Sequence, residues 1–149
     1  MASNVVRTYN PERVIVNVNG HSVTGFADGT FVAIAQVSDG ITTQVGADGE
    51  IARAINTDRR CNVTITLQQT SLSNDFLSNL HDVDMLSCGS KAGPIMIQDL
   101  CGTTLFQAAS SWVTKMPDTE FGKEISTRAW ALQTGAPSAF RVGSNVANG

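Results

Sequence analysis

Apolar and polar residues alternate strictly through CNVTITLQ at residues 61–68. The apolar members are Cys61, Val63, Ile65 and Leu67, and the polar members are Asn62, Thr64, Thr66 and Gln68. Successive side chains of a strand point to opposite faces, so this pattern predicts a strand with one buried face. The other face is polar but carries no charge, although charged side chains are common on exposed surfaces. The central question is what this uncharged face contacts.

The rest of the chain is also poor in charge. Its 149 residues fit a single domain, 1–149, with a core of ordinary size. Charged residues make up 15% of it, against roughly 25% in a typical soluble domain. The net charge of −3 excludes a basic surface for binding a nucleic-acid backbone. Two interpretations remain open: a surface largely covered by other protein, or a neutral monomer rich in Ser, Thr, Asn and Gln.

No pattern typical of a catalytic or metal site is found. The three cysteines (Cys61, Cys88 and Cys101) form no C-x-x-C pair, and His21 and His81 lie far apart in the sequence. No G-x-S-x-G motif or complete phosphate-binding loop occurs. We therefore expect no catalytic residues, no metal and no cofactor, and an enzyme is a distant alternative. The N-terminal stretch has no apolar leader segment and no run approaches the roughly 20 residues of a membrane span, which predicts a soluble protein made in a reducing cytosol.

The remaining pattern predicts a mostly β fold, a sandwich or barrel with one flanking α-helix. A strand is expected at 13–19, and a turn at 27–30 is expected to pair it in a hairpin with a strand at 31–37 that is covered on both faces. One helix follows residue 70, with an apolar stripe of Leu72, Phe76, Leu80 and Val83. Further strands are expected at 95–97, 103–106, 111–114, 127–132 and 140–142.

A long polar segment at 38–58 interrupts the strands. Loops of this length are uncommon in a compact domain unless they are disordered or functional. Ile41, Val45, Ile51 and Ile55 are spaced through it, whereas disordered segments are depleted of such residues. The segment is therefore predicted to be an arm, in the form of a projecting hairpin, that becomes ordered against a partner.

Several stretches resemble the tail tube proteins of contractile-tailed bacteriophages. They are YNPERVIVNVNGHSVTGFADGTFVAI, VGADGEIARAIN, VTITLQQTSLSNDFLSNL and, more loosely, GPIMIQDLCGTTLFQAASSWVTKMP with RAWAL. They follow one another in the family's order over nearly the whole chain. None is specific alone, and the resemblance lies in their succession.

The resemblance implies a virion structural protein whose subunits form hexameric rings. The rings would stack into a hollow tail tube, and strands from each subunit would build a continuous inner β-barrel. Double-stranded DNA would pass through the lumen during ejection without specific binding, and no membrane insertion would occur. The implied partners are other copies of the chain, the tail sheath protein, baseplate or initiator and terminator proteins, and an internal ruler protein. Assembly would take place in the bacterial host cytoplasm.

Within that picture, two sets of residues are candidates for function. A DNA conduit should not retain phosphates, so uncharged strand faces are candidates for the lumen. The lumen-lining candidates are Asn62, Thr64, Thr66, Gln68, Thr127, Ala129, Ala131 and Gln133. The arm at 38–58 would lie between rings, and the candidates for inter-ring contact are Asp39, Asp48, Glu50, Arg53, Arg59 and Arg60.

Other interpretations remain open. Either candidate face could instead point to outer solvent or to the sheath. The protein could also be a tube initiator, a tail terminator or the tube of a phage-like injection device. A monomeric β-barrel that binds a small ligand is a further alternative.

Overall fold

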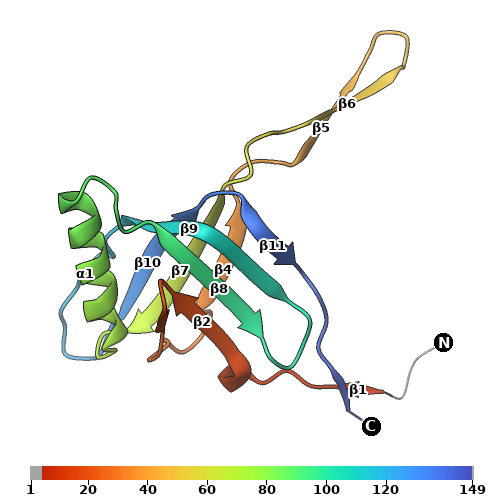
Figure 1. Cartoon of the computed structure of the whole chain (residues 1–149). Helices are drawn as coiled ribbons and strands as arrows, with labels where there is room; N and C mark the ends of the chain where they lie inside the picture. The colour runs from red at the N-terminus through yellow and green to blue at the C-terminus, as the bar shows by residue number, and fades with distance from the viewer. Residues whose placement is uncertain (1–4, 149) are drawn as a thin grey trace.

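A computed structural model describes residues 5–148. Residues 1–4, which belong to the N-terminal stretch expected to lack a leader segment, lie outside the described residues. The main sheet contains β2 (Val14–Val18), β3 (His21–Ser22), β4 (Val32–Gln36), β7 (Cys61–Gln68), β8 (Gly93–Asp99), β9 (Leu105–Lys115), β10 (Thr127–Thr134) and β11 (Pro137–Arg141). The other elements are β1 (Val6–Arg7), the 3-10 helix η1 (Pro11–Arg13), β5 (Ile41–Val45), β6 (Ile51–Ile55), α1 (Ser73–Leu86) and β12 (Ala147–Asn148). The prediction of a mostly β fold with one α-helix is confirmed (Figure 1). No helix within the described range has the length and apolar character needed to cross a membrane.

The main sheet is antiparallel, and its strands follow the order β3-β2-β8-β9-β10-β7-β4. β11 pairs with the first half of β9, next to the part of β9 that pairs with β10. Strands as far apart in this order as β2 and β7 contribute to the same hydrophobic core, so the sheet curves around that core. In the described part of the chain it does not close into a barrel, because β3 and β4 end it on either side.

The alternation in β7 is explained by this core. Val63, Ile65 and Leu67 are completely buried, whereas the intervening polar residues are exposed or half-buried. β10 alternates in the same way, with Trp130 and Leu132 in the core. The Trp130 indole Nε1 donates a hydrogen bond of 2.9 Å to Asn74 Oδ1, which ties β10 to α1.

The strand expected at 31–37 differs from the prediction in two ways. β4 is not covered on both faces, because Ala33 and Ala35 are exposed. It also does not form a hairpin with β2 but pairs with β7. The short strand β3 occupies one side of β2, and the chain then crosses to the far end of the sheet, where Phe26 bridges to Leu67.

The helix stripe was predicted correctly in part, and one strand break was predicted incorrectly. Leu80 is buried and Phe76 packs against the core, as predicted, but Leu72 precedes α1 and is 80% exposed, and Val83 is exposed as well. The buried side of α1 also contains Ser73 and Leu77, which the stripe had not included. The strands expected at 103–106 and 111–114 form one continuous strand, β9, because its weakly strand-forming centre is paired on both sides.

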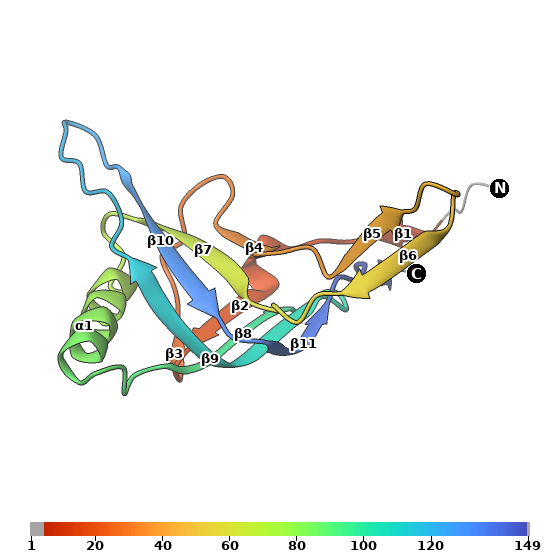
Figure 2. The ribbon, with the colours of Figure 1, turned by 90° about the horizontal axis from the view of Figure 1, so that it is seen from above.

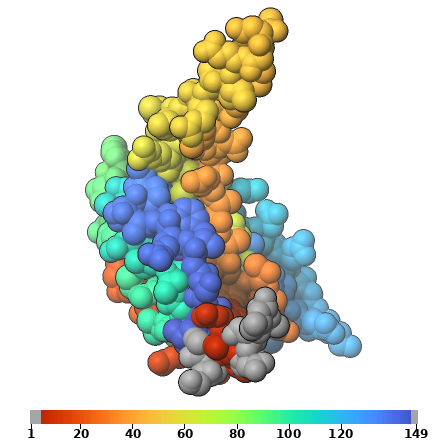
Figure 3. Space-filling model, turned by 90° about the vertical axis from the view of Figure 1, so that its right-hand side faces the viewer, coloured from red at the N-terminus to blue at the C-terminus, as the bar shows by residue number. Residues whose placement is uncertain are grey.

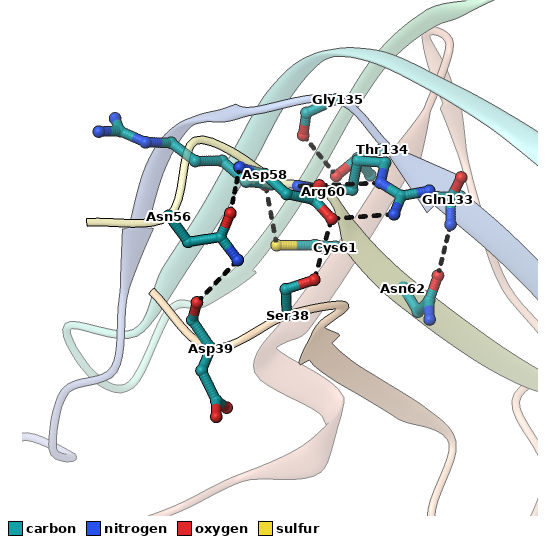
Figure 4. Close-up of polar contacts among 11 residues, drawn as sticks. Ser38, Asp39, Asn56, Asp58, Arg60, Cys61, Asn62, Gln133, Thr134 and Gly135 are labelled. Carbon is teal, nitrogen blue, oxygen red and sulfur yellow. Dashed lines mark hydrogen bonds and ion pairs between the residues drawn. The ribbon is translucent and has the colours of Figure 1, made fainter. Parts of the chain in front are cut away.

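The arm is a two-stranded hairpin of β5 and β6, as predicted, and it projects away from the main sheet (Figures 1 and 3). Its root is held by polar contacts around Asp58 (Figure 4). The Asp58 carboxylate accepts a hydrogen bond of 2.9 Å from Ser38 Oγ and forms an ion pair with Arg60. Asn56 adds a bond from its Nδ2 to the Asp39 carbonyl. These contacts join the two ends of the arm where it leaves the body.

The charge at the arm root perturbs the Asp58 carboxyl. Hydrogen bonding to the Arg60 guanidinium, helped by Ser38, holds the pKa of Asp58 well below its ordinary value. The same contact raises the pKa of Arg60. A carboxylate with a lowered folded-state pKa stabilises the fold above its ordinary pKa, and this contribution is lost as the pH falls towards the folded-state value.

The burial of one side of α1 predicts how substitutions in this helix change the free energy of unfolding. Replacing Leu77, which is fully buried, by alanine leaves a cavity and should lower the free energy of unfolding by about 2–5 kcal/mol. Leu86→Ala, at an 86% exposed position of the same helix, should change it by less than about 0.5 kcal/mol. Urea unfolding followed by circular dichroism measures both values, and equal effects would contradict the placement of α1.

The ion pair at the arm root predicts a pH effect confined to the arm. As the pH falls below the ordinary Asp58 value of 3.8, protonation should weaken the contacts with Arg60 and Ser38. The protection of the Arg60 amide, which donates to Asp58 Oδ1, should then fall before that of the core amides. Amide exchange by NMR measures this order, and Asp58→Asn should remove the pH dependence. Uniform loss of protection across arm and core would contradict it.

Candidate functional site

The eight lumen candidates form one continuous surface. β7 and β10 pair so that Gln68 lies opposite Thr127, Thr66 opposite Ala129, Thr64 opposite Ala131 and Asn62 opposite Gln133. Residues directly opposite in an antiparallel pair point to the same side of the sheet. Two segments separated by nearly 60 residues in the sequence therefore present their uncharged sides together.

β4 extends this surface by one more strand. Its register places Ala33 opposite Thr64 and Ala35 opposite Asn62, so both exposed alanines point the same way. Sequence analysis missed them because alanine counts as apolar, and the strand therefore seemed buried on both sides. We call the surface formed by β4, β7 and β10 the uncharged face. Its members are Ala33, Ala35, Asn62, Thr64, Thr66, Gln68, Thr127, Ala129, Ala131 and Gln133.

The uncharged face has polar groups but no titratable ones. Gln133 Nε2 donates a hydrogen bond of 3.1 Å to Asn62 Oδ1 across the two strands. The nearest charges lie at its margin. Lys115 pairs opposite Ala131 at the end of β9, and the following loop brings Asp118 and Glu120 beside the face in a groove of about 400 Å³.

The orientation of the face is set by what lies behind it. Arg128, Trp130 and Leu132 alternate with the exposed residues of β10 and are buried. Burial raises the pKa of the Cys61 thiol at the start of β7, as expected for a thiol in the core. Shifting either strand by one residue would put these side chains into solvent, so the core fixes which side chains are exposed.

The arm presents a second, different surface. Ile41 lies opposite Ile55, and Val45 lies opposite Ile51, so the four aliphatic side chains share one face of the hairpin. They are between 52% and 74% exposed. The opposite face carries only small or uncharged polar side chains, namely Thr42, Gln44, Ala52 and Ala54. An isolated two-stranded hairpin with so much exposed apolar surface is typical of a segment that packs against another molecule.

The six charged arm candidates fall into three places. Asp48 and Glu50 lie at the tip, where Asp48 Oδ1 accepts a hydrogen bond from the Glu50 amide. Arg53 lies midway along β6, opposite Thr43 and on the aliphatic face. The others are at the root: Asp39, Arg59 and Arg60, of which Arg60 is engaged in the ion pair with Asp58.

Other polar residues have structural surroundings. The His21 ring stacks on Phe76 at a centroid distance of 4.2 Å, and its Nε2 lies 3.1 Å from Ser73 Oγ. Over residues 5–148, no three His, Cys, Asp or Glu side chains are grouped closely enough to hold a metal ion. The main features of this arrangement are two exposed surfaces, the uncharged face and the aliphatic face of the arm.

Comparison with known proteins agrees with this arrangement. The family model described as the bacteriophage PhiTE tail tube protein matches residues 14–139. The chain is also similar to structural protein ORF10 of Pseudomonas phage KPP10, with 29% identity over 145 residues that cover 93% of this chain and 83% of the relative.

Solved structures with a similar fold come from contractile systems and related particles. The chain matches one in the cryo-EM structure of the anti-feeding prophage tube-terminating cap, with a TM-score of 0.58, 12% identity, and coverage of 98% of this chain and 97% of that one. It also matches one in the PVC sheath–tube complex of an extracellular contractile injection system, in its extended state, with a TM-score of 0.54, 12% identity and 93% of both chains covered. At such identities these similarities support the fold alone.

The family model spans the arm, α1 and the main sheet as far as the middle of β11, and it describes a structural protein rather than an enzyme. The chain belongs to the bacteriophage PhiTE tail tube protein family and is a structural component of a phage tail.

Proposed function

We propose that copies of this chain form hexameric rings that stack into a hollow tail tube, with the uncharged face lining the channel. Viral DNA passes along this channel into the host during ejection. The rings assemble in the host cytoplasm, and the tail sheath surrounds the tube. Initiator and terminator proteins lie at its two ends, and an internal ruler protein sets its length.

The observation that carries the proposal is the absence of charge on the uncharged face. Its ten residues include no Lys, Arg, Asp or Glu, although 23 such residues occur in the chain. Neutralising DNA phosphates with cations releases counterions and strengthens binding, which would slow a moving duplex. A channel of Ala, Thr, Asn and Gln provides hydration without such attraction.

Lateral assembly also satisfies the open edge of the sheet. Among the described residues β4 pairs with β7 on one side only, and it forms the border of the uncharged face. An unpaired strand edge tends to pair with another chain, and a closed ring removes that edge. Joining copies through this border extends the uncharged face from one subunit to the next.

A second candidate is a terminating ring that caps a tube. The similarity to the structure of a tube-terminating cap favours it. The projecting arm favours stacking, however, because a ring that ends the tube has a neighbour on one side only, and the exposed aliphatic face of β5 and β6 suits an arm that contacts the next ring.

Negative-stain electron microscopy of the purified full-length chain tests these alternatives. The proposal expects long hollow tubes, whereas a terminating ring gives single discs. A monomer of 15.8 kDa at every concentration in size-exclusion chromatography would overturn both and support a monomeric binding module.

Positive charge introduced into the proposed channel should cause a defect in ejection. The double substitution Thr64→Lys and Thr66→Lys adds two cations to every subunit of each ring. Because these cations attract DNA phosphates, DNA release from otherwise complete particles should slow by at least about tenfold. Thr64→Gln with Thr66→Gln changes size without charge and is the matched control. DNA release triggered in vitro, together with electron microscopy of the particles, measures the effect. Equal release from both variants would show that these residues do not line the DNA path.

A further inference from the structure

Arg128 is a buried cation that has no carboxylate partner among residues 5–148. The residue is 7% exposed, and the single ion pair within that range joins other residues. The guanidinium donates to Ser126 Oγ at 2.6 Å and to the carbonyls of Thr127 and Glu120 at 3.1 and 3.2 Å. It also lies 5.5 Å from the centroid of the Phe121 ring. Buried charges in proteins are normally paired with an opposite charge, so the neutral partners of Arg128 leave its charge uncompensated.

A pocket of about 320 Å³ leads to this guanidinium. It lies between α1 and the loop 116–126 that joins β9 to β10, and we call it the Arg128 pocket. Its lining includes Asn74 and Ser78 of α1, Met116 and Phe121 of the loop, and Trp130. Phe121 is 81% exposed although it forms part of this lining. The pocket therefore combines a cation with apolar side chains and several uncharged polar groups, which suits a carboxylate carried beside an aliphatic side chain.

The tip of the arm has this composition. The Glu50 carboxylate is exposed and makes no hydrogen bond or ion pair within the described residues. Ile51 follows it and is 68% exposed, and Val45, paired opposite Ile51, is 63% exposed. An acidic group and two aliphatic side chains thus project together at the end of β5 and β6.

The pocket and the arm tip cannot meet within one subunit. The arm leaves the body next to Cys61, at the start of β7, whereas Gln69, just beyond the other end of β7, lines the Arg128 pocket. Figures 1 and 2 both place the arm and the loop 116–126 at opposite ends of the molecule. A second copy displaced along β7 brings its arm towards the pocket of the first. Such a contact is head-to-tail and propagates from ring to ring.

We propose that the Arg128 pocket receives the arm tip of a copy in the adjacent ring, with the Glu50 carboxylate pairing with the Arg128 guanidinium. The inference rests on the proposed stacking of rings and names the contact that holds them in register. Val45 and Ile51 pack against Phe121 and Met116 in this arrangement. The pair is formed only on assembly, so the isolated subunit keeps both charges apart.

A disulfide between copies tests the contact without removing Glu50. In a background with Cys88→Ser and Cys101→Ser, Ala47→Cys places a thiol at the arm tip, and Ser78→Cys places one on the pocket wall. Asn79→Cys, the neighbouring exposed position on α1, is the matched control. A disulfide requires Cα atoms within about 7 Å. Oxidised tubes with the Ser78 thiol should give a ladder of linked chains on a non-reducing gel at least about ten times faster than those with the Asn79 thiol.

The charge is tested separately through the concentration needed for assembly. Glu50→Gln removes the carboxylate but keeps the side-chain size, and it should raise the critical concentration for tubes at least about tenfold, because a buried cation is left unpaired. Glu12→Gln removes an exposed carboxylate from η1 and should leave it unchanged. Light scattering over a dilution series measures both.

The outcomes separate this contact from the proposed function. Tubes that form with no preference for the Ser78 thiol, or with equal critical concentrations for the two glutamine variants, overturn the contact and leave the tube intact. If the unmodified chain forms no tubes, the proposed function fails, and the contact fails with it.

Discussion

The pairing of β7 with β10 is the constraint on which the other features depend. Eight residue pairs keep the two alternating patterns in phase. As a result, one side of the pair supplies Val63, Ile65, Trp130 and Leu132 to the core, and the other side remains free of charge. The same ladder positions the helix through the hydrogen bond from Trp130 to Asn74. It also forms the part of the uncharged face to which β4 adds a third strand.

Several charged residues of this chain lie away from the uncharged face, while Lys115, Asp118 and Glu120 lie at its margin. Arg128 is turned into the body, Arg60 is engaged at the arm root, and Asp48 and Glu50 lie at the far end of the arm. A low charge content therefore does not mean a uniformly neutral surface. The arm tip and Arg128 lie beyond opposite ends of β7, where contacts between successive rings are proposed, and no charged residue is among the ten members of the uncharged face.

Much of the local structure followed from the sequence, but the long-range pairings did not. The period of two in β7 identified its buried residues, and the spaced aliphatic residues of the arm indicated a projecting hairpin, because both are local patterns. No local pattern shows that residues 62–68 lie beside residues 127–133, so the two halves of the face were separate candidates until the register joined them. Ala33 was misassigned because alanine is compatible with either side of a sheet. The Arg128 pocket had no sequence signal, since a helix, a loop and a strand form it together.

The insertion of the arm between two strands of the main sheet has a mechanical consequence. The arm continues directly from β4 and into β7, so a pull on its tip draws both strands in the same direction. The resisting contacts are then those between β7 and its other neighbour, β10, whose hydrogen bonds run perpendicular to the strands. Tension along the arm would load these eight residue pairs together in shear rather than opening them one after another. The arm is thereby attached so that a pull along it meets the whole β7–β10 ladder at once.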